Sequence, residues 1–588
     1  MKQIYYVIQT LLRGRGSNII KVLSLGLALT MSILLFVRVV FEQSYDTCYR
    51  DPDRIYQLFS IFTINGEQGE PGELNLPPVA GAVLENFPQE VEAAVSVCKY
   101  MAFGPLYNGS VRFKDYAVMA DSLFFQTLGI EVLRGDPLHE LQQKDVVFLS
   151  DRLAQKMFGD EDPVGKVINY DKQLQLTVKG IYAALPENST MNPEAVISIV
   201  SAWSRDWAEY SWEGGDSFFQ YIRFRPGVKV DIEKFNARLE TVIHNYLPQN
   251  GKDNSSYTSI VKPLRDVYRS GDMVKRMNAI TLILGLAILF IAAMNYVLIS
   301  ISSLSYRAKA VGVHKCNGAS GGTVFSMFLL ETGIVILLSL ILMVLLLLNF
   351  REMIEETMEV RLTSLFVFGR IWVPLVVVLG LFIVGGVLPG RMFSRIPVSQ
   401  VFRHYTEGKK GWKRPLLFIQ FLGVAFICGL MCVIMAQYHY VLNKNTGYDA
   451  RSIATSDIYF DSDSERDAAR QFFCGLPYVE DVESASYPPC IGMSGMRIMD
   501  ESGQSLFSSR YCVETENYPK MMGMVIKEGR MARERNEAVV NETFAKTMRW
   551  GDDIVGRIVH QGNTSLGDLR VVGVLKDFHT ASFYVPQQ

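Results

Sequence analysis

Residues 149–166 read LSDRLAQKMFGDEDPVGK, and residues 540–557 read VNETFAKTMRWGDDIVGR. Both stretches follow one pattern: the end of an apolar strand, an amphipathic helix, an acidic turn, and Val-Gly before a basic residue. One hydrophobic segment precedes the block that holds each stretch, and three more follow the first block. This pattern predicts a duplicated membrane protein whose second half is incomplete at Gln588.

Five apolar segments are long enough to cross about 30 Å of hydrocarbon. The chain has 588 residues, of which 49% are hydrophobic, and this composition favours a membrane protein with large domains outside the bilayer. The expected fold is an α-helical membrane protein with two mixed α/β domains. The predicted transmembrane helices are Val22–Phe41, Thr281–Leu304, Val324–Leu348, Leu365–Leu388 and Leu416–Met435.

Basic residues are concentrated on one side of these segments. The positive-inside rule makes the N-terminal stretch and the loops after the second and fourth segments cytoplasmic, so both large blocks are extracytoplasmic. The residues after the first segment offer no small-residue cleavage pattern, which predicts an uncleaved anchor. The basic residues are Lys2, Arg13, Arg15 and Lys21, then Arg307, Lys309 and Lys315, then Arg391, Arg395, Arg403, Lys409, Lys410, Lys413 and Arg414.

The two large blocks carry the same predicted elements in the same order. In the first block a strand ending at Ser150 precedes a helix that Ser150 or Asp151 could cap, and a second strand follows. The second block repeats this order. Glycines align between the blocks, and we expect them to mark turns with positive φ rather than a ligand site. The aligned pairs are Gly129 and Gly523, Gly135 and Gly529, Gly165 and Gly556, and Gly180 and Gly573.

Several local patterns suggest enzyme chemistry but fail on detail. Residues 159–167, GDEDPVGKV, have five residues between the glycines instead of four, and Val167 stands where a phosphate loop needs Ser or Thr. The adjacent acids Asp160, Glu161 and Asp162 point in different directions, which favours a solvated turn over a calcium site. Zinc-protease, CxxC and GxSxG motifs are absent from the sequence. We therefore predict no catalytic, cofactor or metal site.

The eight cysteines do not form an even set on the oxidising side. A disulfide among Cys474, Cys490 and Cys512 is one reading, and buried or free thiols are the other.

The predicted cytoplasmic loop after the second helix is the most informative segment. It continues from the membrane as a helix with Arg307, Lys309 and Lys315, and ends in a Gly-Ala-Ser turn. One interpretation is a basic anchor among lipid headgroups. The other is a docking helix for a cytosolic partner, since Val311 and Val313 add apolar contact.

This segment resembles the signature of the FtsX/MacB family of ABC transporter permeases, R-x-K-E-I-G-x-R-K-x-x-G-A-S. Ala310 and His314 depart from it. Segments near residues 44–56, 261–264, 385–397 and 416–448 also resemble the family, most closely its eight-span form with two MacB-type domains. The matching residues of the docking signature are Arg307, Lys309, Gly312, Lys315, Gly318, Ala319 and Ser320.

The resemblance implies a permease subunit without ATPase activity. A separate cytosolic ABC ATPase would dock on this segment, and its closure would rock the helices and move the extracytoplasmic domains through stalks at Glu42–Asp53 and Pro263–Met277. A continuous helix there would transmit rotation. A dimeric assembly in the inner membrane and an extracytoplasmic partner are also implied, with no nucleic acid. The alternatives are a non-transporting signal transmitter and a truncated remnant without function.

One carboxylate lies inside a predicted membrane helix. Glu331 in the third helix needs a partner, because an ionised carboxylate in lipid costs a few kcal/mol. The candidates are Asn295 in the second helix and the cytoplasmic basic side chains, whereas a proton relay lacks further titratable groups. The predicted divisions are 1–41 with the first helix, 42–280 the first domain, 281–405 the three-helix domain, 406–435 the basic linker and fifth helix, and 436–588 the second domain.

Overall fold

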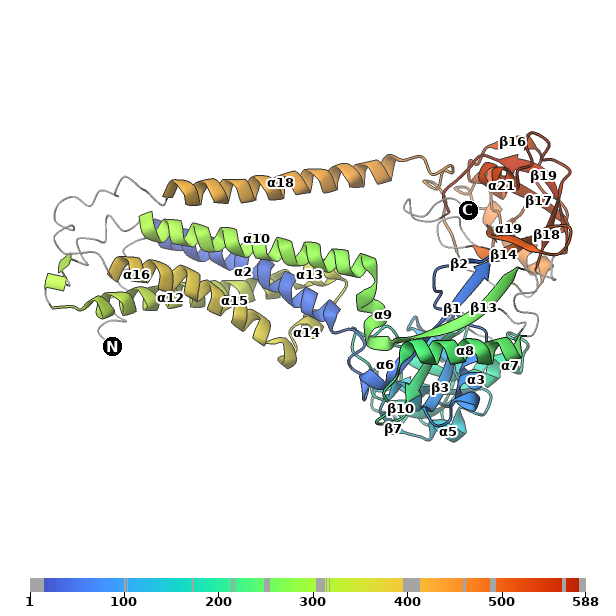
Figure 1. Cartoon of the computed structure of the whole chain (residues 1–588), viewed down its shortest axis with the longest axis horizontal. Coiled ribbons are helices and arrows are strands. Elements are labelled where there is room, and N and C mark those ends of the chain that lie inside the picture. The colour runs from blue at the N-terminus through green and yellow to red at the C-terminus, as the bar shows by residue number, and fades with distance from the viewer. Residues whose placement is uncertain are drawn as a thin grey trace. The chain divides into compact units, whose positions relative to one another are not determined.

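The computed structural model divides into two compact units (Figure 1). The first unit holds residues 1–58, 76–229 and 261–436, and the second holds residues 59–75, 230–260 and 437–588. The residues described are 15–99, 102, 104–171, 174–212, 215, 217–247, 254–302, 312–313, 315–316, 318–394, 413–456, 458, 460, 462–486, 493–562 and 567–580.

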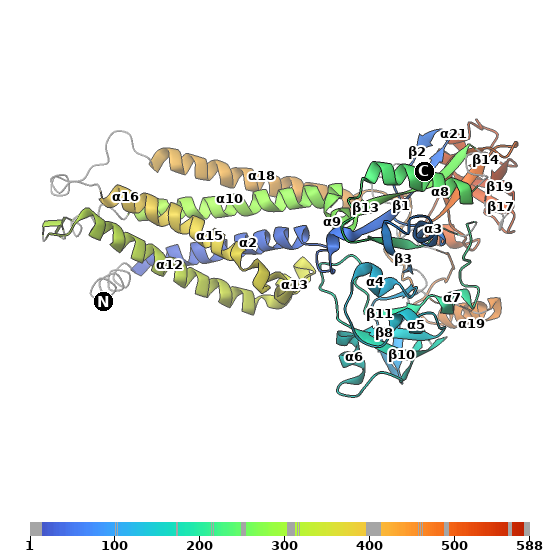
Figure 2. The same ribbon diagram turned by 60° about the horizontal axis from the view of Figure 1, so that its bottom comes forward.

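Within the described ranges, five helices are long and apolar enough to cross a membrane. Four of them pack side by side in both views (Figures 1 and 2), where bulky aliphatic and aromatic side chains of α2, α10, α12 and α15 form a shared core. The helices are α2 (Arg15–Gln43), α10 (Asp272–Ser302), α12 (Gly321–Asn349), α15 (Trp372–Phe382) with α16 (Leu388–Ser394), and α18 (Lys413–Asn443).

The fourth membrane helix differs from its predicted bounds. Its predicted start, Leu365, lies instead in a folded loop made of α13 (Arg351–Met358), α14 (Leu362–Leu365) and η2 (Phe368–Arg370). Arg370 Nη1 donates to the backbone oxygen of Ser364 at 2.6 Å and holds the chain in a turn before α15. Hydropathy alone merged this loop with the helix because its residues are also apolar.

The fourth helix is also interrupted. A π-helical turn at Ile383–Val387, η3, separates α15 from α16. Two successive glycines, Gly385 and Gly386, lie at this turn, where other helices approach closely.

The first α/β domain is built on a mixed sheet with the order β1-β12-β3-β6-β11-β8-β10-β9-β4-β5, with β7 also paired to β10. In the second unit, β2 pairs with the far end of β1, and β13 lies beside β1 in the strand order. The strands are β1 (Ile55–Ile64), β2 (Glu67–Gln68), β3 (Val91–Cys98), β4 (Leu106–Asn108), β5 (Val111–Phe113), β6 (Ala117–Ala120), β7 (Val132–Arg134), β8 (Val146–Ser150), β9 (Val167–Tyr170), β10 (Leu174–Tyr182), β11 (Ala195–Ser198), β12 (Phe219–Phe224) and β13 (Ser255–Pro263).

Short helices connect the strands of this domain. The central strands β6, β8, β11 and β12 are buried along their whole length, as expected for strands covered on both faces. These short helices are η1 (Pro52–Arg54), α3 (Val79–Asn86), α4 (Phe124–Leu128), α5 (Pro137–Glu140), α6 (Asp151–Phe158) and α7 (Val200–Trp203). The helix α9 (Leu264–Ser270) leads from β13 to α10, and α8 (Ile232–Tyr246) belongs to the second unit.

The second α/β domain has a smaller sheet, with the order β15-β14-β18-β19-β16 and β17 paired to β19. Its elements are α19 (Asp463–Cys474), β14 (Ser494–Met499), β15 (Ser505–Tyr511), α20 (Tyr518–Met521), β16 (Ile526–Gly529), β17 (Glu537–Asn541), α21 (Glu542–Thr547), β18 (Ile558–Gln561) and β19 (Leu569–Leu575). Its described cysteines, Cys474 and Cys512, are not bonded to each other, and Cys490 lies outside the described residues.

The two domains share one folding unit. In the first, β10 pairs with β8 in parallel and with β7 and β9 antiparallel. In the second, β19 pairs with β17 in parallel and with β16 and β18 antiparallel. The helix N-termini also correspond, since Ser150 Oγ accepts from Leu153 N at 3.0 Å and Asn541 Oδ1 accepts from Phe544 N at 2.9 Å.

A β-bulge occupies the same place in both units. The register shifts between Val178 and Gly180 in β10, and between their counterparts Val571 and Gly573 where β19 meets β17. Six of the aligned glycines have the positive φ that the sequence predicted, but this reading was wrong for Gly180 and Gly573. A Cβ at Gly180 would lie 2.5 Å from Arg134 O, so these two are required by close backbone approach.

Gly573→Ala tests this reading. The added Cβ would meet the backbone oxygen of Arg530, which a rotamer change cannot relieve, so we expect a loss of about 1–3 kcal/mol in the stability of the second α/β domain. Gly495→Ala in β14 is the control, because nothing lies within 4 Å of its Cβ position. Limited proteolysis at increasing temperatures should show that residues 437–588 are cleaved at a lower temperature in Gly573→Ala than in the wild type. Gly495→Ala should be cleaved at the same temperature as the wild type. Equal cleavage of both variants would contradict the assignment.

Candidate functional site

The first functional feature is the exit of α2 from the bundle. Near the end of this helix Arg38 Nη2 lies 2.6 Å from Glu42 Oε1. The hydroxyl of Tyr268 on α9 donates to Glu42 Oε2 at 2.6 Å, and the rings of Tyr45 and Tyr268 stack with centroids 3.7 Å apart. These contacts join the chain that leaves α2 to the short helix α9, which precedes α10.

The chain after α2 is bound by residues 183–194, the connection between β10 and β11, which we name the receiving loop. The Asp46 carboxylate accepts from the backbone N–H of Thr190 at 2.8 Å and from its hydroxyl at 3.0 Å. Asp46 N donates to Asn188 O at 3.0 Å, and Asn188 Nδ2 donates to Ser44 O at 2.8 Å. The first α/β domain thus holds the chain just beyond the last helical residue and supplies a donor to the carbonyl of Ser44.

The loop between α12 and α15 contacts both the receiving loop and the end of α2 with the chain that follows it. Arg361 Nε lies 3.1 Å from Glu187 Oε1 of the receiving loop. Arg370 Nη2 donates to Ser44 Oγ at 2.8 Å, and Arg38 Nη1 donates to the backbone oxygen of Met358 at 2.9 Å. Both the exit of α2 and the loop between α12 and α15 therefore contact the receiving loop.

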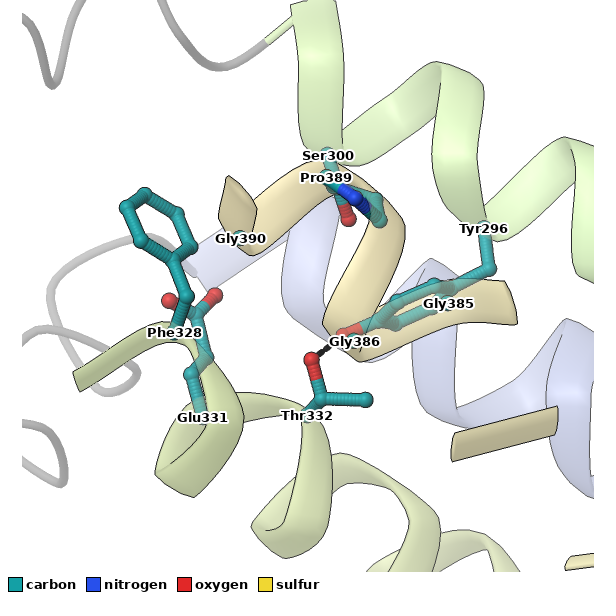
Figure 3. A pocket seen from close by; sticks show the side chains of 9 residues that line it. All are labelled: Tyr296, Ser300, Phe328, Glu331, Thr332, Gly385, Gly386, Pro389 and Gly390. Atoms are coloured by element: carbon teal, nitrogen blue, oxygen red, sulfur yellow. Dashed lines mark hydrogen bonds between the residues drawn. The ribbon is translucent and has the colours of Figure 1, made fainter. Parts of the chain in front are cut away.

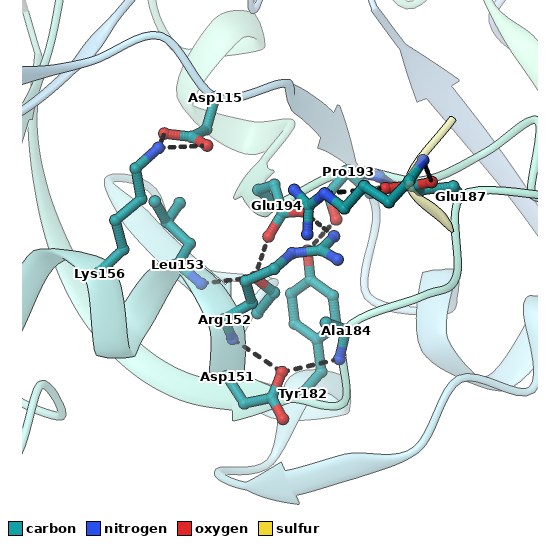
Figure 4. A network of polar contacts seen from close by, with 12 residues as sticks. Asp115, Asp151, Arg152, Leu153, Lys156, Tyr182, Ala184, Glu187, Pro193 and Glu194 are labelled. Atoms are coloured by element: carbon teal, nitrogen blue, oxygen red, sulfur yellow. Dashed lines mark hydrogen bonds and ion pairs between the residues drawn. The ribbon is translucent and has the colours of Figure 1, made fainter. Parts of the chain in front are cut away.

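The other side of the receiving loop is attached to the repeated folding unit (Figure 4). Glu194 accepts from the hydroxyl of Ser150 and pairs with Arg152 at the start of α6. Tyr182 at the end of β10 donates to Pro193 O at 2.7 Å, and Asp151 Oδ1 accepts from Ala184 N at 3.0 Å. The receiving loop is thus bonded to the end of β8, the start of α6 and the end of β10.

Burial changes the titration of this junction. Desolvation raises the pKa of Asp46 to about 6, although the hydrogen bonds from Thr190 act in the opposite direction. Burial and the hydrogen bond to Glu42 raise the pKa of Tyr268, which therefore stays protonated as a donor.

The predicted stalks are not continuous helices. α2 ends at Gln43, and α9 is separated from α10 by Gly271, whose φ and ψ are -56° and 132°. The hydrogen bonds and the stacked tyrosines brace both breaks instead. Sequence reasoning missed the receiving loop, although its polar run Glu-Asn-Ser-Thr at 187–190, separated from the end of β10 by residues 183–186, was a usable signal.

At the opposite end of the bundle lies part of the predicted docking segment. Lys315 Nζ donates to Ser394 O, at the end of α16, at 3.0 Å. Gly318 has φ 86°, and Ser320 Oγ caps α12 by accepting from Thr323 N at 3.2 Å. Gly312 is buried and Ala319 half-buried, while Arg307 and Lys309 lie outside the described residues. The docking role of these residues stays a prediction.

The carboxylate inside the bundle has a basic neighbour. Glu331 Oε1 on α12 lies 3.6 Å from Lys21 Nζ on α2, and Lys21 is 1% exposed. Tyr296 on α10 donates to Thr332 Oγ1 at 3.0 Å. Of the two kinds of partner expected for Glu331, the structure places a basic side chain, Lys21, beside it. The other candidate, Asn295, is half-buried and does not line the adjoining cavity.

This cavity brings three helical segments together (Figure 3). Its volume is about 10 Å³, which is room for about one water molecule. A Cβ at Gly385 would lie 2.9 Å from the Tyr296 ring, so the ring would have to shift, and one at Gly386 would lie 3.2 Å from Thr332 Cγ2, a tight contact; glycine at both positions leaves room for α10 and α12 at the π-helical turn. The lining residues are Tyr296, Ser300, Phe328, Glu331, Thr332, Gly385, Gly386, Pro389 and Gly390.

Comparison with known proteins identifies the family. The model of the MacB-like periplasmic core domain matches residues 22–242 and 419–588. The chain belongs to this family. The predicted family is thereby confirmed, and the two matched segments are those that contain the shared folding unit of the MacB-like domains.

Two curated relatives carry the name macrolide export ATP-binding/permease protein MacB. The Chromobacterium violaceum protein is 26% identical over 39% of this chain and 34% of its own length, and the Vibrio parahaemolyticus protein is 25% identical over 36% and 31%. This MacB-like chain thus spans about a third of the length of these relatives.

Two solved structures are also similar. One is a domain of a Porphyromonas gingivalis protein described as a permease, with 21% identity, 37% of this chain and 91% of that chain covered, and a TM-score of 0.32. The other is the periplasmic region of MacB from Actinobacillus actinomycetemcomitans, with 14% identity, 36% and 91% covered, and a TM-score of 0.26.

Asp46→Asn should change the pH dependence of stability in this MacB-like chain. Because the pKa of Asp46 is raised from its ordinary 3.8 to about 6, the folded state binds the extra proton between these values, and its stability falls as pH rises through them. Asparagine keeps an acceptor for Thr190 but cannot titrate, so about 1–3 kcal/mol of this fall should disappear. The check is the thermal midpoint from pH 4 to 7, and parallel curves for the two proteins would contradict it.

Lys21→Met should destabilise the helix bundle by about 3–5 kcal/mol, because it leaves the Glu331 carboxylate buried without its cation. The double variant Lys21→Met with Glu331→Gln should regain most of that loss. Thermal unfolding in lipid nanodiscs gives the coupling free energy of the pair. Additive losses in the double variant would show that the pair is not coupled.

Proposed function

We propose that this chain is the membrane permease subunit of an ABC transporter, and that it passes the movement of a cytosolic ATPase to extracytoplasmic domains. The observation that carries the proposal is the receiving loop, which the exit of α2 and the loop between α12 and α15 both contact. Family membership and the export function named for the MacB relatives support the same role.

The mechanism begins at the cytoplasmic end. A partner ATPase would bind the docking segment, which the Lys315 side chain ties to the end of α16 and which Ser320 connects to the start of α12. Movement of the partner would therefore shift α12 and α16 together. The glycines of the π-helical turn permit α15 and α16 to change their angle against α10.

At the other end, the loop between α12 and α15 would act on the receiving loop through Arg361, and on Ser44 at the exit of α2 through Arg370. The receiving loop is attached to the β8–α6–β10 unit, so the first α/β domain would follow. In this proposal the chain is an inner-membrane protein that works as a dimer and itself performs no catalysis. Work would be done outside the membrane, either on an exported substrate or on an envelope partner.

Lys309→Glu tests the docking step. Reversing this charge should weaken binding of the ATPase and abolish its stimulation, because the docking segment is proposed to bind through its basic side chains. Lys144→Glu is the control, since Lys144 is an exposed lysine of the first α/β domain. Purification from the native host into nanodiscs, followed by ATPase assay, should recover vanadate-sensitive activity with the wild type and with Lys144→Glu. Absence of any copurifying ATPase with the wild type would favour a remnant without function.

A further inference from the structure

The second membrane-to-domain connection in the chain follows α18, which ends at Asn443. In the first copy, the chain leaving α2 is held at two places in its α/β domain. Asp46 N donates to Asn188 O in the loop after β10, and Arg50 N donates to Gly129 O at 3.3 Å, in the left-handed turn after α4.

The chain leaving α18 is held at the equivalent two places of the second domain. His579 N, in the segment after β19, donates to Thr446 O at 2.8 Å. Asp449 N donates to Met522 O at 2.8 Å, beside the left-handed turn at Gly523 that aligns with Gly129. In the first copy the exit segment donates the bond to the segment after the strand (Asp46 N to Asn188 O), whereas in the second copy it accepts it (Thr446 O from His579 N). The same pair of segments is joined in both copies.

Packing reinforces the second connection. The Tyr448 side chain lies against a core cluster of the second domain that includes Tyr518, Met522 and Leu575. Gly447, with φ 88°, brings the exit segment so close that an added Cβ would lie 2.7 Å from Phe578 Cβ and 2.9 Å from Asp577 O. Only glycine combines this backbone conformation with this approach.

The side chains at the two connections differ. Asp46 is buried and held by Thr190, whereas the matching acid of the Tyr-Asp pair, Asp449, is exposed and pairs with Arg451 at 2.7 Å. Both connections therefore have backbone bonds, to which the first adds a buried carboxylate and the second adds close approach at a glycine.

We propose that residues 444–450 form a second transmission site, at which the exit of α18 is attached to the second α/β domain. The proposal extends the proposed function, because it makes α18 a separate input to a second moving domain. With the partner ATPase present, movement of α18 would first displace the segment after β19 and the turn at Gly523.

Hydrogen exchange of the full chain in lipid nanodiscs tests the attachment. Gly447→Ala should push the exit segment away from Phe578 and speed exchange of the His579 and Asp449 amides by about tenfold. Gly503→Ala is the matched control, since Gly503 has φ 81° in the β14–β15 turn with nothing within 4 Å of its Cβ position. The proposal fails if these amides are unchanged in Gly447→Ala, or if both variants change them equally.

A second variant tests the attachment in case Gly447→Ala unfolds the second α/β domain as a whole. His579→Pro removes the donor to Thr446 without adding atoms at Gly447, so the Asp449 amide should lose protection while β17 and β19 keep theirs. Unchanged protection of Asp449 in this variant also overturns the proposal. These exchange measurements need no ATPase, so their result does not depend on the proposed ABC function. Failure of the attachment at residues 444–450 can therefore be distinguished from failure of the proposed function.

Discussion

The chain that leaves the C-terminus of α2 is held by the receiving loop, which hydrogen-bonds to groups just beyond the last helical residue. Asn188 and Thr190 bind the backbone of Ser44 and Asp46 and the Asp46 carboxylate, so the helix and the first α/β domain share hydrogen bonds instead of a continuous helix. Because these groups are buried, breaking the contact would expose or strand several polar atoms together. The junction should therefore move as one body.

In the helix bundle the main constraint is the free-energy cost of burying a charged side chain among apolar ones. Glu331 and Lys21 come from helices far apart in sequence and lie together where four helical segments converge. A buried pair of this kind contributes little net stability but strongly disfavours arrangements that separate its partners. The pair therefore fixes how α2 and α12 face each other. The nearby π-helical turn, with two glycines against Tyr296 and Thr332, is the place where the remaining helix can bend.

The two α/β domains show how a short sequence repeat specifies a shape. Each copy has a capped helix after a parallel strand, a bulge in the partner strand, and a glycine where two backbones approach too closely for a side chain. The outer parts of the domains differ, with thirteen strands in the first sheet and six in the second among the described residues. In both domains the chain leaving the membrane helix is bonded to the segment that follows this unit, at Asn188 and Thr190 in the first and at His579 in the second.

The sequence by itself determined the class of protein, the apolar helices, the repeated unit and the family, because hydropathy, caps and aligned glycines are local signals. It also indicated that Glu331 needs a partner, since the cost of a lone charge in lipid does not depend on the fold. Tertiary structure alone decided that Lys21 lies beside Glu331, that Gly180 is required by contact with Arg134, and that Asn188 and Thr190 receive the exit of α2. These contacts join residues 46 to 310 positions apart, and their geometry depends on how sheets and helices pack, which no local pattern records.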